Sequence, residues 1–421
     1  MRLGAVADDV TGACDLAGRV VEAGLPTTVL LGTPSEAPDA FPADGPGCAV
    51  VALKIRTAPV AEAVAEATDA ARLLRAAGAT QLYQKYCSTF DSTAQGNIGP
   101  VADALAGVAA ADGTAVTVGT PATPGSGRTQ YQGTLFVDGV PLAESPMRDH
   151  PLTPMRDSDL VRLLRPQTGR TVGLVRWQEV QRGSDAIASA VGDGHTLVDA
   201  LTEADLDAIA RAVLALAEER PVVAGGGAGV ATALARAAAD SSAGARASTL
   251  PTVPVTGRVI LAGSASAATR GQIAAFPGER LVLDPLELAA GPSALDRVRD
   301  ALAARADRLA PVLIHASPEV AAAQRELGAE RAATLLEDAI AALAAFAVHE
   351  LGVSHLLVAG GETSGAVTGT IGIDRLRIGS QAAPGVPWAV ADSAGRTVAV
   401  LLKSGNFGGP GLFTDAWEVA P

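Results

Sequence analysis

The stretch LYQKYCSTFDSTAQGNIGPV, residues 82–101, joins a strand pattern to a helical pattern through a polar loop. The run QLYQKYC is typical of a β-strand, and PVADALAGV is typical of a helix. Residues 88–99 therefore form a strand-to-helix loop that carries hydroxyl, carboxylate and amide side chains. In open α/β sheets, loops at the carboxyl ends of strands bind ligands, so we expect this loop to belong to a binding site.

The same alternation of strand and helix extends along the chain. Short β-type runs such as LGAVAD, TTVLLG and CAVVALKI are separated by Ala-rich helical patterns such as PVAEAVAEATDAARLLRAAG. This rhythm predicts βαβ units and mainly parallel sheets. One segment, RTQYQGTLFVDGVPLAES, breaks the rhythm, and its Val-Asp-Gly-Val predicts a hairpin in a small antiparallel excursion. The final runs WAVADS and TVAVLLKSGNFGG predict a terminal β-pair.

A change of composition predicts two domains. Residues 239–257, ADSSAGARASTLPTVPVTG, are small, polar or Pro/Gly residues, as in a linker. We expect one domain at residues 1–245 and a second at 246–421. The predicted fold class is α/β, with two domains that each contain a mainly parallel sheet flanked by helices. The active site is expected in the cleft between these domains.

Composition excludes several classes of protein. The 421 residues are 48% apolar and 18% charged, which favours well-filled cores. The net charge of −13 disfavours nucleic acid and anionic membranes as partners. Three cysteines form no CxxC pair, no zinc spacing and no even-numbered disulfide framework. The N-terminus meets Asp8 and Asp9 too early for a signal peptide, and no apolar run approaches the roughly 20 residues of a membrane span. We expect a soluble cytoplasmic protein that binds small molecules and could form a homo-oligomer.

Two polar loops in the first half are candidate substrate sites. Asp8 and Asp9 follow the first strand pattern, where they could accept hydrogen bonds from a substrate hydroxyl or hold Mg²⁺. A helix N-cap is the alternative interpretation of this pair. The second loop offers groups for a polyhydroxylated acid at Lys85, Ser88, Thr89, Asp91, Ser92, Thr93 and Asn97.

Glycines and a cysteine in the second loop suggest further roles. Gly96 and Gly99 could let backbone N–H groups approach a carboxylate or phosphate at the helix start. A cysteine nucleophile needs a histidine base, and no histidine lies near Cys87 in the sequence. We therefore interpret Cys87 as a structural residue.

Glycine-rich loops in the second half are candidate phosphate sites. Residues 360–365, GGETSG, follow a buried strand pattern and precede a helix, so their backbone amides could face phosphates. Glu362 or Thr363 could contact a ribose or a metal ion. The segments LAGSASAATRGQ and LKSGNFGG also place small residues directly after strands.

Familiar nucleotide signatures are incomplete or missing. No G-x-x-x-x-G-K-[ST] occurs, which excludes a P-loop enzyme. Residues 222–235, VVAGGGAGVATALA, are similar to a dinucleotide fingerprint, but the third glycine is misplaced and no acid follows at about 20 residues. This run supports either NAD binding or a simple helix-start turn. The five scattered histidines predict no metal cluster, and the metal ligands stay unassigned.

The polar and glycine-rich loops together resemble those of the four-carbon acid sugar kinase family. The segments ADDVTGACD, KYCSTFDSTAQGNIGPV, GSASAATRGQ, AGGETSGAV, PGVPW and LKSGNFG carry this resemblance over nearly the whole chain. CSTFDST…GNIGP and the following YQGTLFVDGVPLAESPMRDHPLTPMRDSDLVRLL resemble the 3-oxo-tetronate kinases within it. Phe90 precedes Asp91, and residues 94–96 read Ala-Gln-Gly where threonate and erythronate kinases tend to have Leu-Arg-Gly.

The resemblance implies an N-terminal acid-sugar domain, a C-terminal ATP domain, and transfer of a phosphate from ATP with Mg²⁺ to the C4 hydroxyl of 3-oxo-tetronate (3-dehydro-erythronate). It implies catalytic roles for Asp9 and Asp91. The implied substrate-binding residues are Asp8, Arg56, Lys85, Ser88 and Ser92, and the implied ATP-binding residues are Ser264, Gly360, Gly361, Glu362, Thr363 and Gly405. The alternatives are an NAD-dependent sugar-acid dehydrogenase using residues 225–229 and a non-catalytic sugar-acid sensor.

Overall fold

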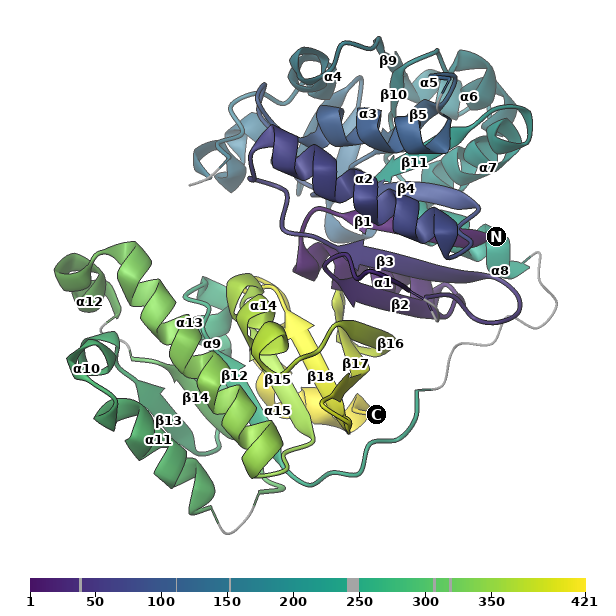
Figure 1. Cartoon of the computed structure of the whole chain (residues 1–421). Helices are drawn as coiled ribbons and strands as arrows, with labels where there is room; N and C mark the ends of the chain where they lie inside the picture. Colours follow the sequence, from purple (N-terminus) through teal and green to yellow (C-terminus); the bar gives the residue numbers. More distant parts are fainter. Residues whose placement is uncertain (38–39, 111, 151–152, 241–249, 306–307, 318–319) are drawn as a thin grey trace. The chain divides into compact units, whose positions relative to one another are not determined.

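The computed structural model describes residues 1–37, 40–110, 112–150, 153–240, 250–305, 308–317 and 320–421. The chain divides into two compact units, Met1–Ser248 and Thr249–Pro421. Each unit contains its own sheet with helices packed on it, which confirms the predicted α/β class (Figure 1). The boundary expected at residues 245–246 lies outside the described residues.

The sheet of the first unit is parallel in every described pair of neighbouring strands. Its order is β2-β3-β1-β4-β11-β5-β10-β9. The strands are β1 (Arg2–Ala7), β2 (Thr27–Leu31), β3 (Gly47–Ala52), β4 (Gln81–Lys85), β5 (Val116–Thr120), β9 (Val172–Val175), β10 (His195–Val198) and β11 (Val222–Gly226). The alternation of strands and helices seen in the sequence therefore gives the predicted parallel sheet.

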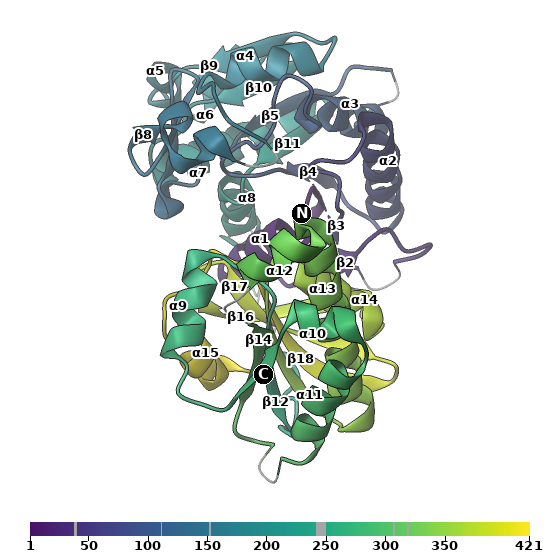
Figure 2. The same cartoon turned by 90° about the vertical axis from the view of Figure 1, so that its left-hand side faces the viewer.

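Helices cover both faces of this sheet. The long ones are α1 (Val10–Glu22), α2 (Val60–Ala76), α3 (Ile98–Ala109), α7 (Glu203–Glu219) and α8 (Gly229–Asp240), and the short ones are α4 (Leu160–Leu164), α5 (Trp177–Val180) and α6 (Ser184–Ala190). Leu82 and Val223 pack with the alanines of α2, whereas Tyr83, on the opposite side of β4, donates to the Gly227 carbonyl before α8. Figure 2 shows α2 and α8 on opposite sides of the strands. The period-2 alternation of a strand buried on both faces explains this arrangement.

The predicted antiparallel excursion is present. It contains β6 (Arg128–Tyr131), β7 (Thr134–Val137) and β8 (Val140–Pro141), followed by single turns at Leu142–Glu144 and Pro146–Asp149. Asp138 and Gly139 have φ values of 51° and 81°, as a two-residue hairpin turn requires. Leu135, Leu142 and other apolar residues of this segment share a core cluster with Tyr86 and Phe90. The antiparallel excursion thus packs directly against the loop that follows β4.

The sheet of the second unit has the order β13-β14-β12-β15-β18-β17-β16. Its parallel strands are β12 (Arg258–Ala262), β13 (Arg280–Leu283), β14 (Val312–Ala316), β15 (His355–Ala359) and β18 (Arg396–Lys403). β17 (Val386–Ser393) pairs antiparallel with β18, which confirms the predicted terminal pair. A further antiparallel strand, β16 (Arg375–Ala383), was not predicted, because a register shift interrupts its alternation beyond Ile378.

The helices of the second unit include one long apolar segment. They are α9 (Ala267–Ala275), α10 (Pro285–Ala290), α11 (Ser293–Ala303), α12 (Val320–Leu327), α13 (Ala329–Ala345), α14 (Gly361–Thr370) and α15 (Leu412–Asp415). α13 continues through a π turn at Phe346–Glu350, and together they are long and apolar enough to cross a membrane by length and composition. This corrects the expectation that no apolar run approaches that length. Leu336, Ile340 and Leu343 of this helix are buried within the unit.

Candidate active site

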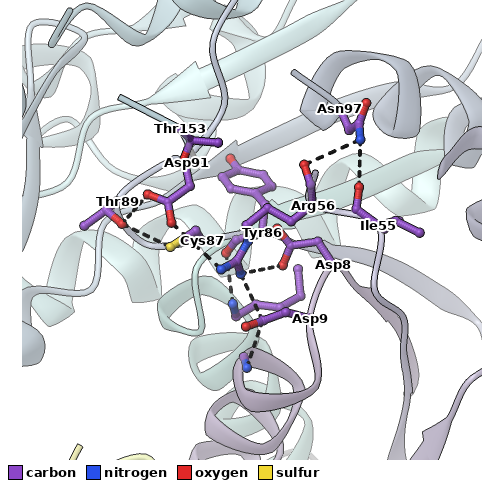
Figure 3. Close-up of polar contacts among 12 residues, drawn as sticks. Asp8, Asp9, Ile55, Arg56, Tyr86, Cys87, Thr89, Asp91, Asn97 and Thr153 are labelled. Carbon is purple, nitrogen blue, oxygen red and sulfur yellow. Dashed lines mark hydrogen bonds and ion pairs between the residues drawn. The ribbon is translucent and has the colours of Figure 1, made fainter. Parts of the chain in front are cut away.

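Charged side chains from three loops meet at the carboxyl end of the first unit's sheet (Figure 3). Asp8 and Asp9 follow β1, Arg56 lies in the loop after β3, and Asp91 lies in the loop after β4. The Arg56 guanidinium donates from Nε and Nη2 to the two carboxylate oxygens of Asp8, at 2.8 and 2.9 Å. Its Nη2 also lies 2.9 Å from Asp9 Oδ1, and its Nη1 lies 3.8 Å from Asp91 Oδ2. One arginine therefore connects three carboxylates.

Asp9 caps helix α1, as the alternative interpretation of the aspartate pair proposes. Its Oδ1 accepts a hydrogen bond from the Gly12 N–H at 2.9 Å, and its Oδ2 accepts one from the Thr11 hydroxyl at 2.9 Å. Burial by itself raises the pKa of Asp9, but the charges of Arg56 and Lys85 outweigh it and leave the pKa below its ordinary value. Both oxygens of Asp9 are thus engaged by the protein.

Asp91 has a strained backbone, and its carboxylate makes fewer hydrogen bonds to the protein than that of Asp9. Phe90 and Asp91 have φ values of 66° and 41°, in the left-handed region that non-glycine residues seldom occupy. The Phe90 ring is buried and packs edge-on against Tyr86 at 5.8 Å between centroids. Asp91 Oδ1 accepts a hydrogen bond from the Thr89 hydroxyl at 2.7 Å, while Oδ2 meets the more distant Arg56. The sequence indicated Phe90 only as a residue that distinguishes the subgroup. In the structure its buried ring fixes the turn that places Asp91 beside Thr89 and Arg56.

Gln167 fastens the loop around Ser92. The Ser92 hydroxyl and the Gly99 N–H both donate to Gln167 Oε1, at 3.2 and 3.0 Å, and Gln167 Nε2 donates to the Thr93 carbonyl at 2.7 Å. The Gly99 amide is therefore occupied, and a Cβ at Gly96 would lie 1.9 Å from Ser92 Oγ. The Gly96 N–H likewise donates to the Thr93 carbonyl at 2.8 Å, so the prediction that these two amides receive an anion is wrong. Gln167 was missed, since nothing local in the sequence relates it to Ser92.

Lys85 and Ser88 complete the first-unit set. Lys85 is 4% exposed, and its Nζ donates to the Tyr86 carbonyl at 2.9 Å. A Cβ at Gly12 would lie 2.8 Å from this Nζ, so Lys85 reaches the start of α1. Ser88 lies beside Gly227, where an added Cβ would contact Ser88 Cβ at 3.4 Å.

A small pocket gathers most of the predicted first-unit residues. Its polar lining consists of Asp8, Arg56, Gln84, Lys85, Asp91, Ser92 and Asn97, with Tyr86, Ile55, Ile98 and other apolar side chains beside them. Asp9 and Ser88 are not part of this lining. Asn97 donates from Nδ2 to the Ile55 carbonyl at 2.7 Å, which holds the loop after β3 against α3. Cations and carboxylates in one pocket suit a small hydroxylated acid.

Cys87 is unsuited to nucleophilic attack. Burial, with the negative charge of Asp91, raises the pKa of the Cys87 thiol to about 12 despite the opposing charges of Arg56 and Lys85. Its sulfur lies 3.0 Å from the Thr89 hydroxyl. We expect Cys87→Ser to keep kcat within about threefold of the unchanged protein, because the thiol stays protonated near neutral pH. Steady-state turnover before and after iodoacetamide treatment checks this, and inactivation by the reagent through Cys87 would contradict it.

Three loops of the second unit approach one another after β12, β15 and β18. A Cβ at Gly263 would lie 2.2 Å from Thr363 Oγ1, and one at Gly405 would lie 2.2 Å from Ser264 Oγ. Gly360 has a φ of 131°, and its lack of a side chain avoids a close contact with Ser264 and Thr363. Gly361 and Glu362 are exposed at the start of α14, and Gly360 provides no side-chain cap there. The predicted nucleotide residues thus come together around a helix N-terminus, which favours phosphate binding.

The glycines at residues 225–229 serve packing. A Cβ at Gly226 would lie 2.0 Å from the Thr120 carbonyl oxygen, and one at Gly229 would lie 2.6 Å from the Ala122 carbonyl oxygen. These glycines let β11 and α8 approach the chain that follows β5. This arrangement corresponds to the second interpretation of the run, a simple turn at the start of a helix, rather than to an NAD site. Among the residues that the structure describes, no group of three or more His, Cys, Asp or Glu side chains could hold a metal ion.

Comparison with known proteins identifies the family. Residues 3–234 match the sugar-binding N-terminal domain model, and residues 259–413 match the nucleotide-binding C-terminal domain model. Relatives named 3-oxo-tetronate kinase include one from Methylobacterium radiotolerans, 46% identical over 100% of this chain and 99% of the relative. Another, from Burkholderia multivorans, is 45% identical over 98% of this chain and 96% of the relative.

Solved structures agree with this result over the full length. A Salmonella typhimurium protein superposes with a TM-score of 0.86 at 37% identity, covering 100% of both chains. A Haemophilus influenzae protein superposes with a TM-score of 0.81 at 35% identity, covering 99% of both chains. The two domain models and the full-length relatives together show that the chain belongs to the four-carbon acid sugar kinase family.

Proposed function

We propose that this protein is an ATP-dependent kinase that phosphorylates the C4 hydroxyl of 3-oxo-tetronate. The observation that carries the proposal is the pocket in the sugar-binding unit, where Arg56 and Lys85 lie beside Asp8 and Asp91. The names of the full-length relatives support the same substrate. The glycine-rich loops of the nucleotide-binding unit supply the place for ATP.

The substrate carboxylate is assigned to Arg56 Nη1 and Lys85. The other nitrogens of Arg56 bind Asp8 and Asp9, so Nη1 is the part of the guanidinium that keeps donor capacity. Lys85 uses one of its three donors on the Tyr86 carbonyl. With its carboxylate held by these two cationic groups, the acid would present its C4 hydroxyl to Asp91.

Asp91 is proposed to orient the attacking hydroxyl and accept its proton. Among the described contacts its Oδ2 accepts no hydrogen bond and only faces Arg56 Nη1 at 3.8 Å, whereas Asp9 is engaged as a helix cap. We therefore keep Asp9 as a residue that fixes Arg56 and α1 rather than as the proton acceptor. Phosphoryl transfer depends mainly on such alignment and on neutralising charge, and less on covalent chemistry by the protein.

ATP is assigned to Ser264, Thr363 and the glycines at residues 360, 361 and 405, with Glu362 near the ribose or the metal ion. Mg²⁺ usually binds through nucleotide phosphates, waters and one or two carboxylates rather than a full protein cage. Glu362 is the carboxylate among the assigned ATP residues that fits this mode, and the ion would neutralise the phosphate charge. We also infer that the enzyme works in the cytoplasm, where ATP is available.

A coupled assay of ADP release tests the function. We expect MgATP-dependent ADP release with 3-oxo-tetronates, and slower or no release with threonates and erythronates of either hand. The same substrates with NAD should give no change in nicotinamide absorbance, because residues 225–229 pack against protein carbonyls. No ADP release with any of these acids would overturn the kinase proposal, and faster release with a threonate would overturn the substrate assignment.

A further inference from the structure

A buried lysine lies at the end of β18, beside the nucleotide loops. Lys403 is 0% exposed. Its Nζ donates to Thr269 Oγ1 at 3.0 Å, to Gln272 Oε1 at 2.9 Å and to the Gly405 carbonyl at 3.1 Å. Because neutral oxygens take all three of its donors, the ammonium charge is not cancelled by a hydrogen-bonded carboxylate. Such a residue is costly to bury, which suggests that it serves the adjacent site.

The Gly405 carbonyl is the point on which these bonds converge. It accepts from Lys403, from the Ser266 hydroxyl at 2.6 Å and from the Thr269 hydroxyl at 2.8 Å. This carbonyl belongs to the central peptide of a turn closed by the Phe407 N–H and the Ser404 carbonyl at 3.2 Å. The central peptide of a β-turn can flip between two orientations, the second of which places the third residue at positive φ. Asn406 has no positive φ here, so the turn is in the first orientation.

The three donors therefore decide where the Asn406 N–H points. The described chain has no cis peptide, and in a planar trans peptide the N–H points opposite to the C=O. With the Gly405 carbonyl drawn inward to Lys403 and α9, the Asn406 N–H points outward. Gly405 lies against Ser264, whose backbone borders Gly360 at the start of α14. The Gly405–Asn406 peptide therefore lies beside the loops to which the phosphates are assigned, and its N–H points away from Lys403 and α9.

We propose that Lys403 is a positioning residue for the nucleotide, which locks the Gly405–Asn406 peptide so that the Asn406 N–H faces the ATP phosphates. This inference rests on the proposed function, because it takes the glycine-rich loops as the ATP site. The residue also brings a positive charge toward the phosphates. Burial lowers the pKa of Lys403 to about 8, but this value is still above 7, and the side chain is mostly protonated at neutral pH.

Direct nucleotide binding tests the inference. We expect Lys403→Met to bind MgADP about 10- to 100-fold more weakly by calorimetry, the effect of losing a hydrogen bond to a charged group. The KM for ATP should rise in step, while the KM for the sugar acid stays unchanged. Lys54→Met, at an exposed lysine of the first unit, is the matched control and should leave MgADP binding unaltered.

A second variant guards against a failure of folding. Thr269→Val removes one donor to the Gly405 carbonyl and one acceptor of Nζ at nearly constant volume, so it should also weaken MgADP binding. If either variant is folded by circular dichroism and binds MgADP as tightly as the unchanged protein, the inference is wrong. If the unchanged protein itself binds no MgADP, the assignment of the ATP site fails with it. If that protein binds MgADP but phosphorylates no acid, only the substrate proposal fails.

Discussion

Replacing Asp91 by asparagine is expected to lower kcat about 100- to 10,000-fold, the range for loss of a general base. Asparagine has nearly the same shape, but it cannot accept the proton of the C4 hydroxyl. Asp91 Oδ2 is the site carboxylate oxygen with the most remaining acceptor capacity, since its ion-pair partner, Arg56 Nη1, is 3.8 Å away, too far for a hydrogen bond. The variant should retain MgADP affinity, because the nucleotide residues belong to the second unit.

The fold should tolerate this change. Asp91 sits at φ 41°, and asparagine is one of the few residues that adopt the left-handed region readily. The hydrogen bond from the Thr89 hydroxyl can still be accepted by the amide oxygen. A loss of turnover therefore reports on the lost carboxylate rather than on a collapsed loop.

Asp138→Asn is the matched control for Asp91→Asn. Asp138 also has a left-handed φ, 51°, but its side chain is exposed in the hairpin turn of the same unit. Its replacement should leave kcat and both KM values unchanged in the coupled ADP-release assay. A turnover for Asp91→Asn within a few-fold of the control would remove Asp91 from the chemistry and return the role to Asp9 or to water.

The sheets could be predicted from the sequence because their signals are local. Apolar runs separated by Ala-rich helices predict parallel strands, and Asp138-Gly139 predicts a hairpin through the backbone angles that it allows. β16 was missed because its alternation stops at the register shift after Ile378. Likewise, the apolar length of α13 with its π turn was underestimated, since alanines make a helix apolar without a conspicuous run.

The site was predictable where a residue lies at a strand end. Asp8 and Lys85 follow or end a strand, so the rule for α/β sheets finds them, whereas Arg56 entered only through the family resemblance. Gln167 and the left-handed turn at Phe90 depend on contacts across many residues, which no local pattern contains. For the same reason, the sequence predicted an anion site at Gly96 and Gly99, whereas in the structure these glycines allow close packing.

Replacing Arg56 by methionine is expected to destabilise the first unit and to abolish productive binding of the sugar acid. Arg56 joins Asp8, Asp9 and Asp91, and its removal leaves three carboxylates facing one another in a partly buried pocket. Burial works against its charge, but Asp8 and the neighbouring groups raise the pKa of Arg56 above its ordinary value, so it is charged at any working pH. We expect the free energy of unfolding to fall by about 3 kcal/mol.

Arg72→Met provides the comparison in urea unfolding followed by circular dichroism. Arg72 pairs with Asp69 on the exposed face of α2, so its loss should cost less than about 0.5 kcal/mol. Adding Asp8→Asn to Arg56→Met removes one of the stranded charges and should recover part of the stability without restoring substrate binding. If Arg56→Met unfolds at the same urea concentration as Arg72→Met, the carboxylates are not held together by Arg56. In that case Arg56 would instead be free to bind the substrate carboxylate with its whole guanidinium, and the loss would appear in KM alone.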